Sequence, residues 1–485
     1  MSVSRHTGYN LIGGAVPLAL ALVTVPIYLR LVGPDRYGVL AIAWLVLGYF
    51  GLFDLGLGQA TSFRVAALRD ATPLARARTF WAALFVNTGM GLVGGAALWF
   101  AARFFFGHVF KVQEALRPEI LRSMPFLAAS VPVATVTGVL SGALQGRERF
   151  LETNIISTFS TCLFLLLPLA VAWRFGPDLA FLLCAAVTAR LLAALAFAYR
   201  CYLQFGRGYR PRLERQEVLL LLKYGGWVTA TSAFGPILVV ADRFLIGAIL
   251  GAVPVAIYSV PFELARQITL LPMSLTSALF PRLAAAPPTD QKAMGEQATR
   301  VLAALLSLPV LGAIFLVQPF LDLWVGRHIG IRSAPIGRIL LIGFWANGFA
   351  MIPYTRLQAG GRPDLVTKVL VVQIVPYVAC LYLATMHFGL AGAAGALAIR
   401  LAADYAILTW ISGRDFRSLP LLAGNLGMLL LGAYCATRWQ IVDWRWWLSA
   451  SVLGTATSIV GWLALPIAFR KQATQRIADF VTHQT

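Results

Sequence analysis

The chain has 485 residues, of which 59% are hydrophobic and 12% charged, and its formal net charge is +20. A soluble domain is about 45–50% apolar and about 25% charged, so this composition excludes a soluble globular protein. Together with a mean hydropathy of +0.75, it predicts an all-α protein that crosses a membrane many times. Much of the positive charge is expected to set membrane orientation, and nucleic-acid binding is not needed to explain it.

About fourteen windows of roughly 20 apolar residues are long enough to span a bilayer as helices. They cover residues 8–32, 38–58, 79–101, 124–144, 154–173, 178–199, 225–250, 253–280, 299–324, 334–357, 365–386, 389–412, 419–439 and 445–469. No loop between them is long enough for a sizeable soluble domain. Function is therefore expected to lie among the helices.

Lysine and arginine are divided unevenly between the alternate loops of this topology. The side with both termini and the connections from even-numbered to odd-numbered spans has 24, the other side has 12, and 4 lie inside spans. Positively charged loops face the cytoplasm, so both termini are predicted to be cytoplasmic. The richest inner loop is the basic segment 201–223 with its flanking Arg200.

Four charged residues stand out in the first six spans, because a charge in hydrocarbon costs about 2.5 kcal/mol or more. Asp54 has no basic residue one helical turn away and needs water, a partner helix or a proton. Arg190 is similarly alone in the sixth span, so a cavity or an anion should solvate it. Arg30, beside the first outer turn, and Arg64, at the inner end of the second span, could instead extend to the interface.

Two later pairs have a structural interpretation. Asp242 and Arg243 are sequence neighbours near the outer end of the seventh span, where we expect them to point to different sides of the helix and to fix a lobe. Arg400 and Asp404 lie four residues apart in the twelfth span and can meet on one helix face. Structural ion pairs of this kind reduce the cost of burying a charge.

The eighth span contains a pair for which function is the favoured interpretation. Glu263 and Arg266 lie three residues apart, so they too can pair on one face. Pro261 and Pro272 interrupt the same helix. Transporters expose backbone and bend at broken helices, so this pair is expected to belong to a transport site.

A shift of 218 residues aligns two parts of the chain. It places Leu31-Val32-Gly33 near Leu250-Gly251 and residues 62–67 (SFRVAA) over residues 280–285 (FPRLAA), with Arg64 opposite Arg282. This predicts two parallel six-helix lobes related by an axis along the membrane normal. The predicted parts are an N-terminal lobe (1–200), a cytoplasmic linker (201–223), a C-terminal lobe (224–413), two further helices (414–470) and a cytoplasmic tail (471–485).

Catalytic and metal-binding motifs are missing. The chain has no GxxxxGK[ST], GxSxG or HExxH, its five histidines are scattered, and its five cysteines have no CxxC spacing. We therefore expect a protein that is not an enzyme and has no cofactor and no metal. Spans one, two, seven and eight together supply eight charged residues, five of them arginines: Arg30, Asp54, Arg64, Asp242, Arg243, Glu263, Arg266 and Arg282. Arginine binds phosphate oxygens bidentately, so these residues predict an anionic ligand.

Five short motifs are similar to those of a known family. They are residues 26–38 (PIYLRLVGPDRYG), 54–56 (DLG), 242–247 (DRFLIG) followed by 258–261 (YSVP), 280–283 (FPRL) and 358–363 (QAGGRP). As a set they resemble the O-antigen and polysaccharide flippases, and the resemblance covers nearly the whole chain. The superfamily also includes the lipid II flippases and the multidrug and toxin extruders.

The resemblance implies two six-helix lobes in a V around a central cationic cavity. It also implies that undecaprenyl-diphosphate-linked oligosaccharide, an O-antigen or exopolysaccharide repeat unit, moves from the cytoplasmic to the outer leaflet of the bacterial inner membrane by alternating access. A polysaccharide polymerase and a chain-length regulator are candidate partners. Fourteen helices match the lipid II branch, whereas many O-antigen flippases have twelve, so the branch stays open.

The resulting site hypothesis places the diphosphate among Arg64, Arg266 and Arg282. Arg30 and Arg190 are further candidates for substrate binding, and Arg30, Arg64 and Arg266 resemble by position the essential arginines of the lipid II branch. Asp54 or Glu263 would couple a proton or cation. The alternatives are a lipid II-type flippase or a drug or cation extruder, whose cavity should be rich in carboxylates. A membrane glycosyltransferase or polymerase is less favoured, because it needs a large outer loop or an acidic cluster.

Overall fold

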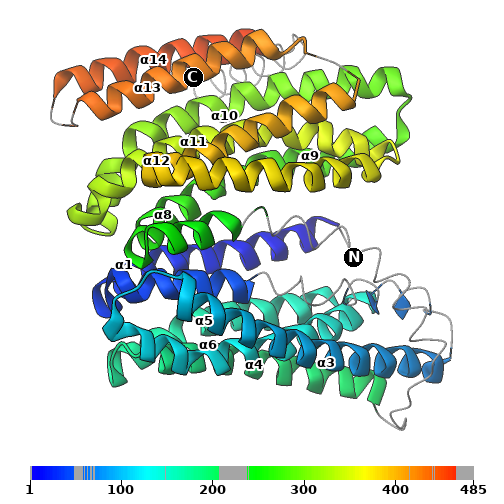
Figure 1. The fold of residues 1–485 in the computed structure, drawn as a ribbon. Helices are drawn as coiled ribbons and strands as arrows, with labels where there is room; N and C mark the ends of the chain where they lie inside the picture. Colours follow the sequence, from blue (N-terminus) through cyan, green and yellow to red (C-terminus); the bar gives the residue numbers. More distant parts are fainter. Residues whose placement is uncertain are drawn as a thin grey trace, which may run out of the picture. The chain divides into compact units, whose positions relative to one another are not determined.

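The computed structural model describes residues 3–48, 58, 61–62, 64–65, 68, 72–147, 149–206, 238, 240–413, 416–439, 441 and 443–465. Their regular elements are all helical (Figure 1). Within these residues, nine helices are long and apolar enough to cross a membrane. The all-α expectation is thus confirmed for the described part, while the total of fourteen spans stays a prediction.

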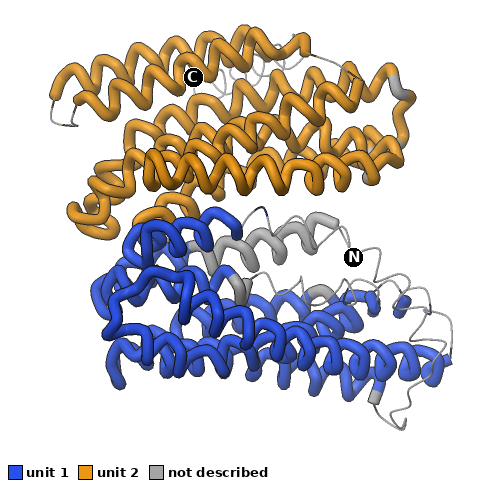
Figure 2. The backbone as a smooth tube through the Cα atoms, in the orientation of Figure 1, with its two compact units in different colours: residues 1–256 blue, residues 257–485 orange. Residues whose placement is uncertain are grey.

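The chain forms two compact units, Met1–Ala256 and Ile257–Thr485 (Figure 2). The first contains α1 (Val3–Gly48), α3 (Pro73–Phe104), α4 (Arg117–Gly146), α5 (Phe150–Phe175), α6 (Leu179–Cys201) and the short η2 (Phe105–Val109), η3 (Glu114–Leu116) and η4 (Tyr202–Gly206). Helix α8 (Ala252–Arg266) crosses the boundary. The second unit continues with η5 (Gln267–Thr269), α9 (Leu270–Ala285), α10 (Pro288–Trp324), α11 (Arg327–Ala359), α12 (Pro363–Ile411), α13 (Leu419–Arg438) and α14 (Trp444–Ala464).

The boundary between the units lies after Ala256, whereas the C-terminal lobe was predicted to begin at residue 224. Contacts of the seventh span give a physical reason for the difference. Phe244 packs on Phe105 of η2 with ring centroids 5.1 Å apart, and the Lys111 ammonium donates to the Ile249 carbonyl at 2.8 Å. Residues 240–249 are therefore held on helices of the first unit. Most of the predicted linker lies outside the described residues, so the lobe boundaries stay a prediction.

Three of the glycines with positive φ in the described ranges lie at sharp turns that bear on the predicted repeat and spans. Gly33 (φ +81°) divides α1 into two helices, and Gly389 (φ +60°) divides α12 in the same way. Gly251 (φ +102°) precedes α8. Glycine adopts such angles without the steric penalty of a Cβ atom. Gly33 and Gly251 are also the two positions that the 218-residue shift aligns, so both predicted lobes have a glycine with positive φ at this turn.

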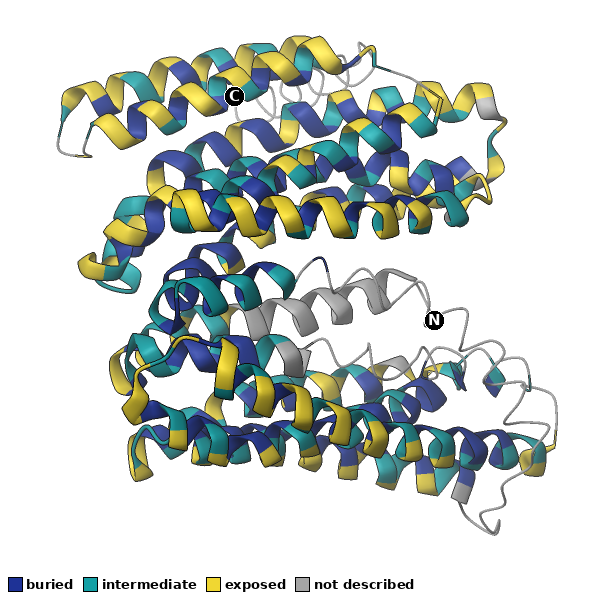
Figure 3. Cartoon of the chain, in the orientation of Figure 1, coloured by how far each residue is buried: buried dark blue, intermediate teal, exposed yellow. Residues whose placement is uncertain are grey.

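The surface of the described helices is strongly apolar. Exposed positions run along α3, α5, α13 and α14 (Figure 3), and many are large hydrophobic residues, including Val93, Phe100, Phe159, Trp173, Tyr434 and Leu463. In water such a surface would drive aggregation. It matches helices whose outer faces contact lipid.

A carboxylate that the sequence interpretation missed connects three helices of the first unit. Glu119 of α4 accepts hydrogen bonds from Arg36 Nε and Nη2, both at 3.0 Å, and from the Leu179 backbone N–H at the start of α6, at 2.7 Å. Glu119 is buried. Its hydrogen bonds raise the pKa of Arg36 above the ordinary arginine value, so the guanidinium stays charged at physiological pH.

We expect Glu119→Gln to lower the free energy of unfolding by about 1.5–3 kcal/mol, because an amide removes the charge and points a donor at Arg36. Thermal unfolding of the detergent-purified protein measures this loss. Glu114→Gln is the matched control, since Glu114 pairs with Arg117 on an exposed surface where an ion pair contributes little. Equal melting temperatures for the two variants would refute the role of Glu119.

Candidate substrate and ion sites

The predicted break in the eighth span is present. Helix α8 ends at Arg266, one turn of 3₁₀-helix follows in η5, and α9 begins at Leu270. Pro261 has no N–H, so it cannot donate to the Ile257 carbonyl one turn earlier. The Ser333 hydroxyl of α11 donates to that carbonyl instead, at 2.9 Å. A polar side chain of a neighbouring helix thus satisfies the backbone that the proline leaves open.

Two glycines of α11 accommodate the two prolines. A Cβ atom on Gly337 would lie 3.2 Å from Pro261 Cβ, and one on Gly348 would lie 2.8 Å from Pro272 Cγ. The proline rings therefore pack against α11 where it lacks side chains. Together with the Ser333 hydrogen bond, this packing fixes one face of the broken helix.

Glu263 and Arg266 lie on another face of the same helix. At about 100° per residue, they are turned roughly 140–200° away from Pro261. Arg266 Nη2 lies 3.1 Å from Glu263 Oε2, as the spacing predicts, and the two side chains are 50% and 52% exposed. The structure thus places a charged pair on the free face of a break whose other face is anchored.

Replacing Ser333 by alanine is expected to cost about 1–2 kcal/mol of stability, because the buried Ile257 carbonyl loses its partner. Thermal unfolding of the purified protein is the measurement. Ser274→Ala on α9 provides the control, since its exposed hydroxyl bonds only to Leu270 of its own helix. If Ser333→Ala melts at the same temperature as Ser274→Ala, the carbonyl is satisfied in another way.

The other predicted substrate-binding arginines have different environments. Arg282, near the end of α9, and Arg30, three residues before the Gly33 turn, are exposed, and Arg64 is half-buried. Their convergence with Arg266 on one substrate stays a prediction. Asp54, the first candidate for ion coupling, lies outside the described residues.

Arg190 has an aromatic partner on a neighbouring helix, and its role in substrate binding stays a prediction. Its guanidinium carbon lies 4.5 Å from the centroid of the Phe164 ring on α5. The negative face of an aromatic ring attracts a cation in such a geometry, most strongly where water is excluded. The sequence offered no means of finding this partner, because α5 and α6 are separate spans.

Asp242 and Arg243 contact each other, so the prediction that they point to different sides of the helix is wrong. Arg243 Nη1 lies 3.5 Å from Asp242 Oδ1, and the same oxygen accepts the Arg243 backbone N–H at 2.7 Å. Both residues are fully buried. The long arginine side chain folds back to its neighbour because an unpaired buried carboxylate is far more costly.

Arg400 and Asp404 form the ion pair that their spacing predicts. Arg400 Nη2 lies 3.4 Å from Asp404 Oδ2, and both side chains are largely buried. The Arg400 guanidinium also lies over the Tyr377 ring at 5.3 Å. Tyr377 precedes the Gly389 turn and Arg400 follows it, so the contact joins the two halves of α12.

The sequence analysis did not identify one further buried arginine, Arg338. Arg338 of α11 donates to Gln318 Oε1 of α10 at 3.0 Å, to Thr437 Oγ1 of α13 at 3.0 Å and to the Ala436 carbonyl at 2.8 Å. It lies near the start of a predicted span, where a charged residue is easily assigned to the loop. The polar residues Gln318 and Thr437 on the neighbouring helices were the sequence features that could have indicated its partners.

Comparison with known proteins agrees with this architecture. The structure is similar to a lipid II flippase, MurJ, in an inward closed conformation, with a TM-score of 0.74 at 12% identity over 93% of this chain and 97% of MurJ. It is also similar to an inward-facing multidrug resistance transporter of the MATE family and MOP superfamily, with a TM-score of 0.68 at 15% identity over 84% and 98% of the two chains. The protein thus has the fold of this superfamily of multi-pass membrane transporters.

Sequence comparison gives the family. Residues 3–286 match the family described as "Polysaccharide biosynthesis protein", and the chain belongs to this family. It is also 29% identical over 431 residues to a Shigella flexneri protein named "Putative O-antigen transporter", covering 85% of this chain and 98% of that protein. The family indicated by the five motifs is confirmed.

Proposed function

We propose that this protein is a flippase for undecaprenyl-diphosphate-linked oligosaccharide, an O-antigen or exopolysaccharide repeat unit. The observation that carries the proposal is the half-exposed Glu263–Arg266 pair on the free face of a broken apolar helix. Charges at such positions in a span face a cavity or a path for substrate. Family membership and similarity to the Shigella flexneri protein support a polysaccharide-related substrate.

In this mechanism two six-helix lobes form a V and open alternately to the cytoplasm and to the outer face. Arg266 contacts the diphosphate, and Arg64 and Arg282 complete a cationic cavity, while the polyprenyl chain remains in lipid. A guanidinium has five N–H donors, so Arg266 can bind a phosphate while it remains paired with Glu263. In this proposal the protein lies in the bacterial inner membrane with both termini in the cytoplasm, and the uneven distribution of lysine and arginine supports that orientation.

The membrane potential could supply the driving force in this scheme. Moving a negative charge outward across an inside-negative membrane is favourable by about 2.3 kcal/mol per charge per 100 mV. Glu263 and Asp54 are the candidate groups for additional coupling to a proton or cation. A polymerase and a chain-length regulator would then use the exported repeat unit.

Reconstitution tests the proposal directly. Liposomes that contain the purified protein should move a fluorescent diphosphate-linked oligosaccharide between leaflets, and protein-free liposomes should not. Deletion of the gene should remove the surface glycan. Altered drug tolerance with unchanged glycan would favour a drug extruder, transport of lipid II alone would favour the lipid II branch, and release of sugar from its carrier would indicate an enzyme.

A further inference from the structure

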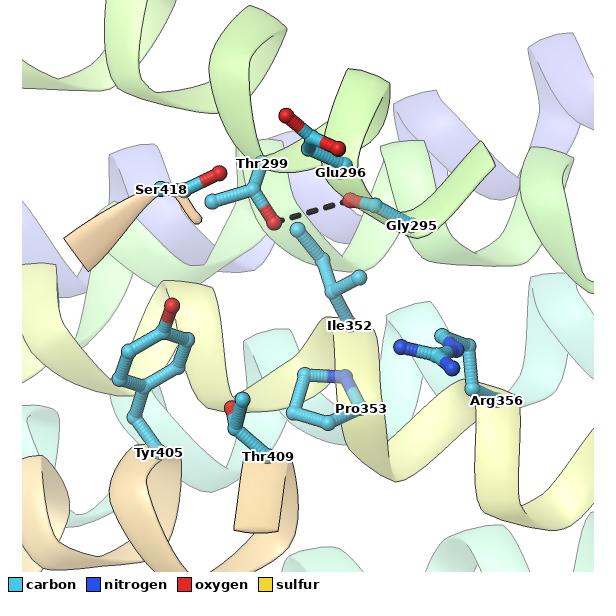
Figure 4. Close-up of a pocket in the computed structure, with 9 residues that line it drawn as sticks. All are labelled: Gly295, Glu296, Thr299, Ile352, Pro353, Arg356, Tyr405, Thr409 and Ser418. Atoms are coloured by element: carbon cyan, nitrogen blue, oxygen red, sulfur yellow. Dashed lines mark hydrogen bonds between the residues drawn. The ribbon is translucent and has the colours of Figure 1, made fainter. Parts of the chain in front are cut away.

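The second unit contains a polar pocket that the proposed transport site does not include. It lies between α10, α11, α12 and the start of α13, and its empty volume is about 310 Å³, part of it open to solvent. Thr299, Arg356, Tyr405 and Thr409 are among the side chains that surround it (Figure 4). The helix ends that form it belong to the side that the lysine and arginine distribution predicts to be cytoplasmic.

Arg356 is built into the wall of this pocket. Its Nη2 donates to the Ser412 carbonyl at 3.1 Å, and its side chain crosses α10 at Gly295, where a Cβ atom would lie 2.8 Å from Arg356 Cδ. Glycine at this position leaves room for the side chain. The guanidinium is thus held in place beside the empty volume, and a planar fork of N–H donors suits phosphate oxygens.

Positive charge predominates around the pocket. The Glu296 carboxylate is its acidic lining group, and it is already paired with Arg300 at 2.6 Å and with Arg417 at 3.8 Å. Lys292 is also close, because a Cβ atom on Gly413 would lie 3.2 Å from its Nζ. The lining thus contains one cation, Arg356, and one carboxylate that two outer arginines already pair with, which favours an anion.

An unsatisfied donor points to the same conclusion. Thr409 is 4% exposed, and its hydroxyl has no hydrogen-bond partner within the described ranges. A buried hydroxyl normally has a partner, so a group that enters the pocket should satisfy it. Phosphate oxygens are acceptors that suit both a hydroxyl and a guanidinium, and Thr409 and Arg356 line the same pocket.

We propose that this pocket binds a phosphate group, carried by an anionic phospholipid of the inner leaflet or free in solution. Basic pockets between membrane helices on the cytoplasmic side are typical sites for anionic lipid headgroups. The site is separate from the Glu263–Arg266 pair and does not depend on the proposed transport function. A bound headgroup would contact α10, α11, α12 and the start of α13, so the lipid composition of the membrane would affect how these helices pack.

Native mass spectrometry of the full-length, detergent-purified protein with added phosphatidylglycerol tests the proposal. Arg356→Gln should weaken lipid retention about tenfold and Thr409→Val about threefold, because each removes one donor to the phosphate. Arg327→Gln, at the other end of α11, is the matched control and should bind as the unmodified protein does. Without lipid, Thr409→Val should keep its melting temperature, since the hydroxyl it removes has no partner to lose.

A second arm with inorganic phosphate identifies the source of the group. Binding of phosphatidylglycerol that millimolar phosphate does not displace supports a headgroup site, and phosphate binding with the same dependence on Arg356 and Thr409 supports a free-phosphate site. The proposal is overturned if neither probe binds, or if Arg327→Gln weakens binding as much as Arg356→Gln. Either result leaves the reconstitution test of transport unaffected.

Discussion

Replacing Arg266 by alanine is expected to abolish glycan export while the protein still reaches the membrane. Arg266 is the last residue of α8, its side chain is half-exposed, and its partner Glu263 lies on the same free face. Loss of a bidentate contact to a diphosphate should reduce transport by about a hundredfold or more, since hydrogen bonds to charged groups contribute about 1.5–3 kcal/mol each. Surface glycan and membrane protein levels, measured in the same cells, give the answer.

Two further variants distinguish substrate binding from loss of charge alone. Arg266→Lys keeps the charge but not the planar fork, so we expect partial export. Arg362→Ala removes an exposed arginine that pairs with Asp364 outside the broken helix and should export normally. Normal export by Arg266→Ala would exclude Arg266 from the substrate site.

Replacing Arg338 by methionine is expected to detach the end of α13 from α10 and α11. The change keeps an unbranched, flexible stem but removes the donors to Gln318, Thr437 and the Ala436 carbonyl. The carbonyls in the last turn of a helix have no partner within it, so Ala436 loses its cap in an apolar environment. We expect the free energy of unfolding to fall by about 3 kcal/mol, because several hydrogen bonds of about 1 kcal/mol each are lost.

Thermal unfolding in detergent measures this effect, and cross-linking locates it. A disulfide between cysteines introduced on facing positions of α10 and α13 should form more slowly in Arg338→Met. Arg438→Met is the matched control, because Arg438 lies at the end of the same helix and is exposed. Unchanged stability in Arg338→Met would mean that apolar packing compensates for the buried charge, as happens when buried ion pairs are replaced by hydrophobic residues.

Features with a local cause were predictable from the sequence. Ion pairs at spacings of three and four residues, Glu263 with Arg266 and Arg400 with Asp404, follow from the geometry of a single helix. The break after Arg266 follows in the same way from two prolines that remove backbone donors. The turn at Gly33 belongs to this group as well, because glycine adopts a positive φ without the steric penalty of a Cβ atom.

Contacts between separate helices were not predictable. Arg190 lies against the Phe164 ring of α5, and Glu119 pairs with Arg36 of α1. Ser333 of α11 donates a hydrogen bond to a carbonyl of α8. Each requires knowing which helix faces are adjacent, and apolar spans of similar composition do not encode that in their periodicity. Asp242 and Arg243 show the same limit at short range, because a long flexible side chain can reverse the direction that its Cα position suggests.

The sequence by itself determined that this is a many-helix membrane protein of the polysaccharide family, that it turns at Gly33 and Gly251, and that several of its charges lie in apolar helices. Composition, hydrophobic length and proline or glycine positions act locally, so they can be read without a fold. Only the tertiary structure decided which of those charges are buried in ion pairs, as Arg400 and Asp404 are, and which are exposed, as Glu263 and Arg266 are. The polar pocket around Arg356 could be found only from the tertiary structure, because its lining comes from segments between Gly295 and Ser418 that meet only when the helices pack together.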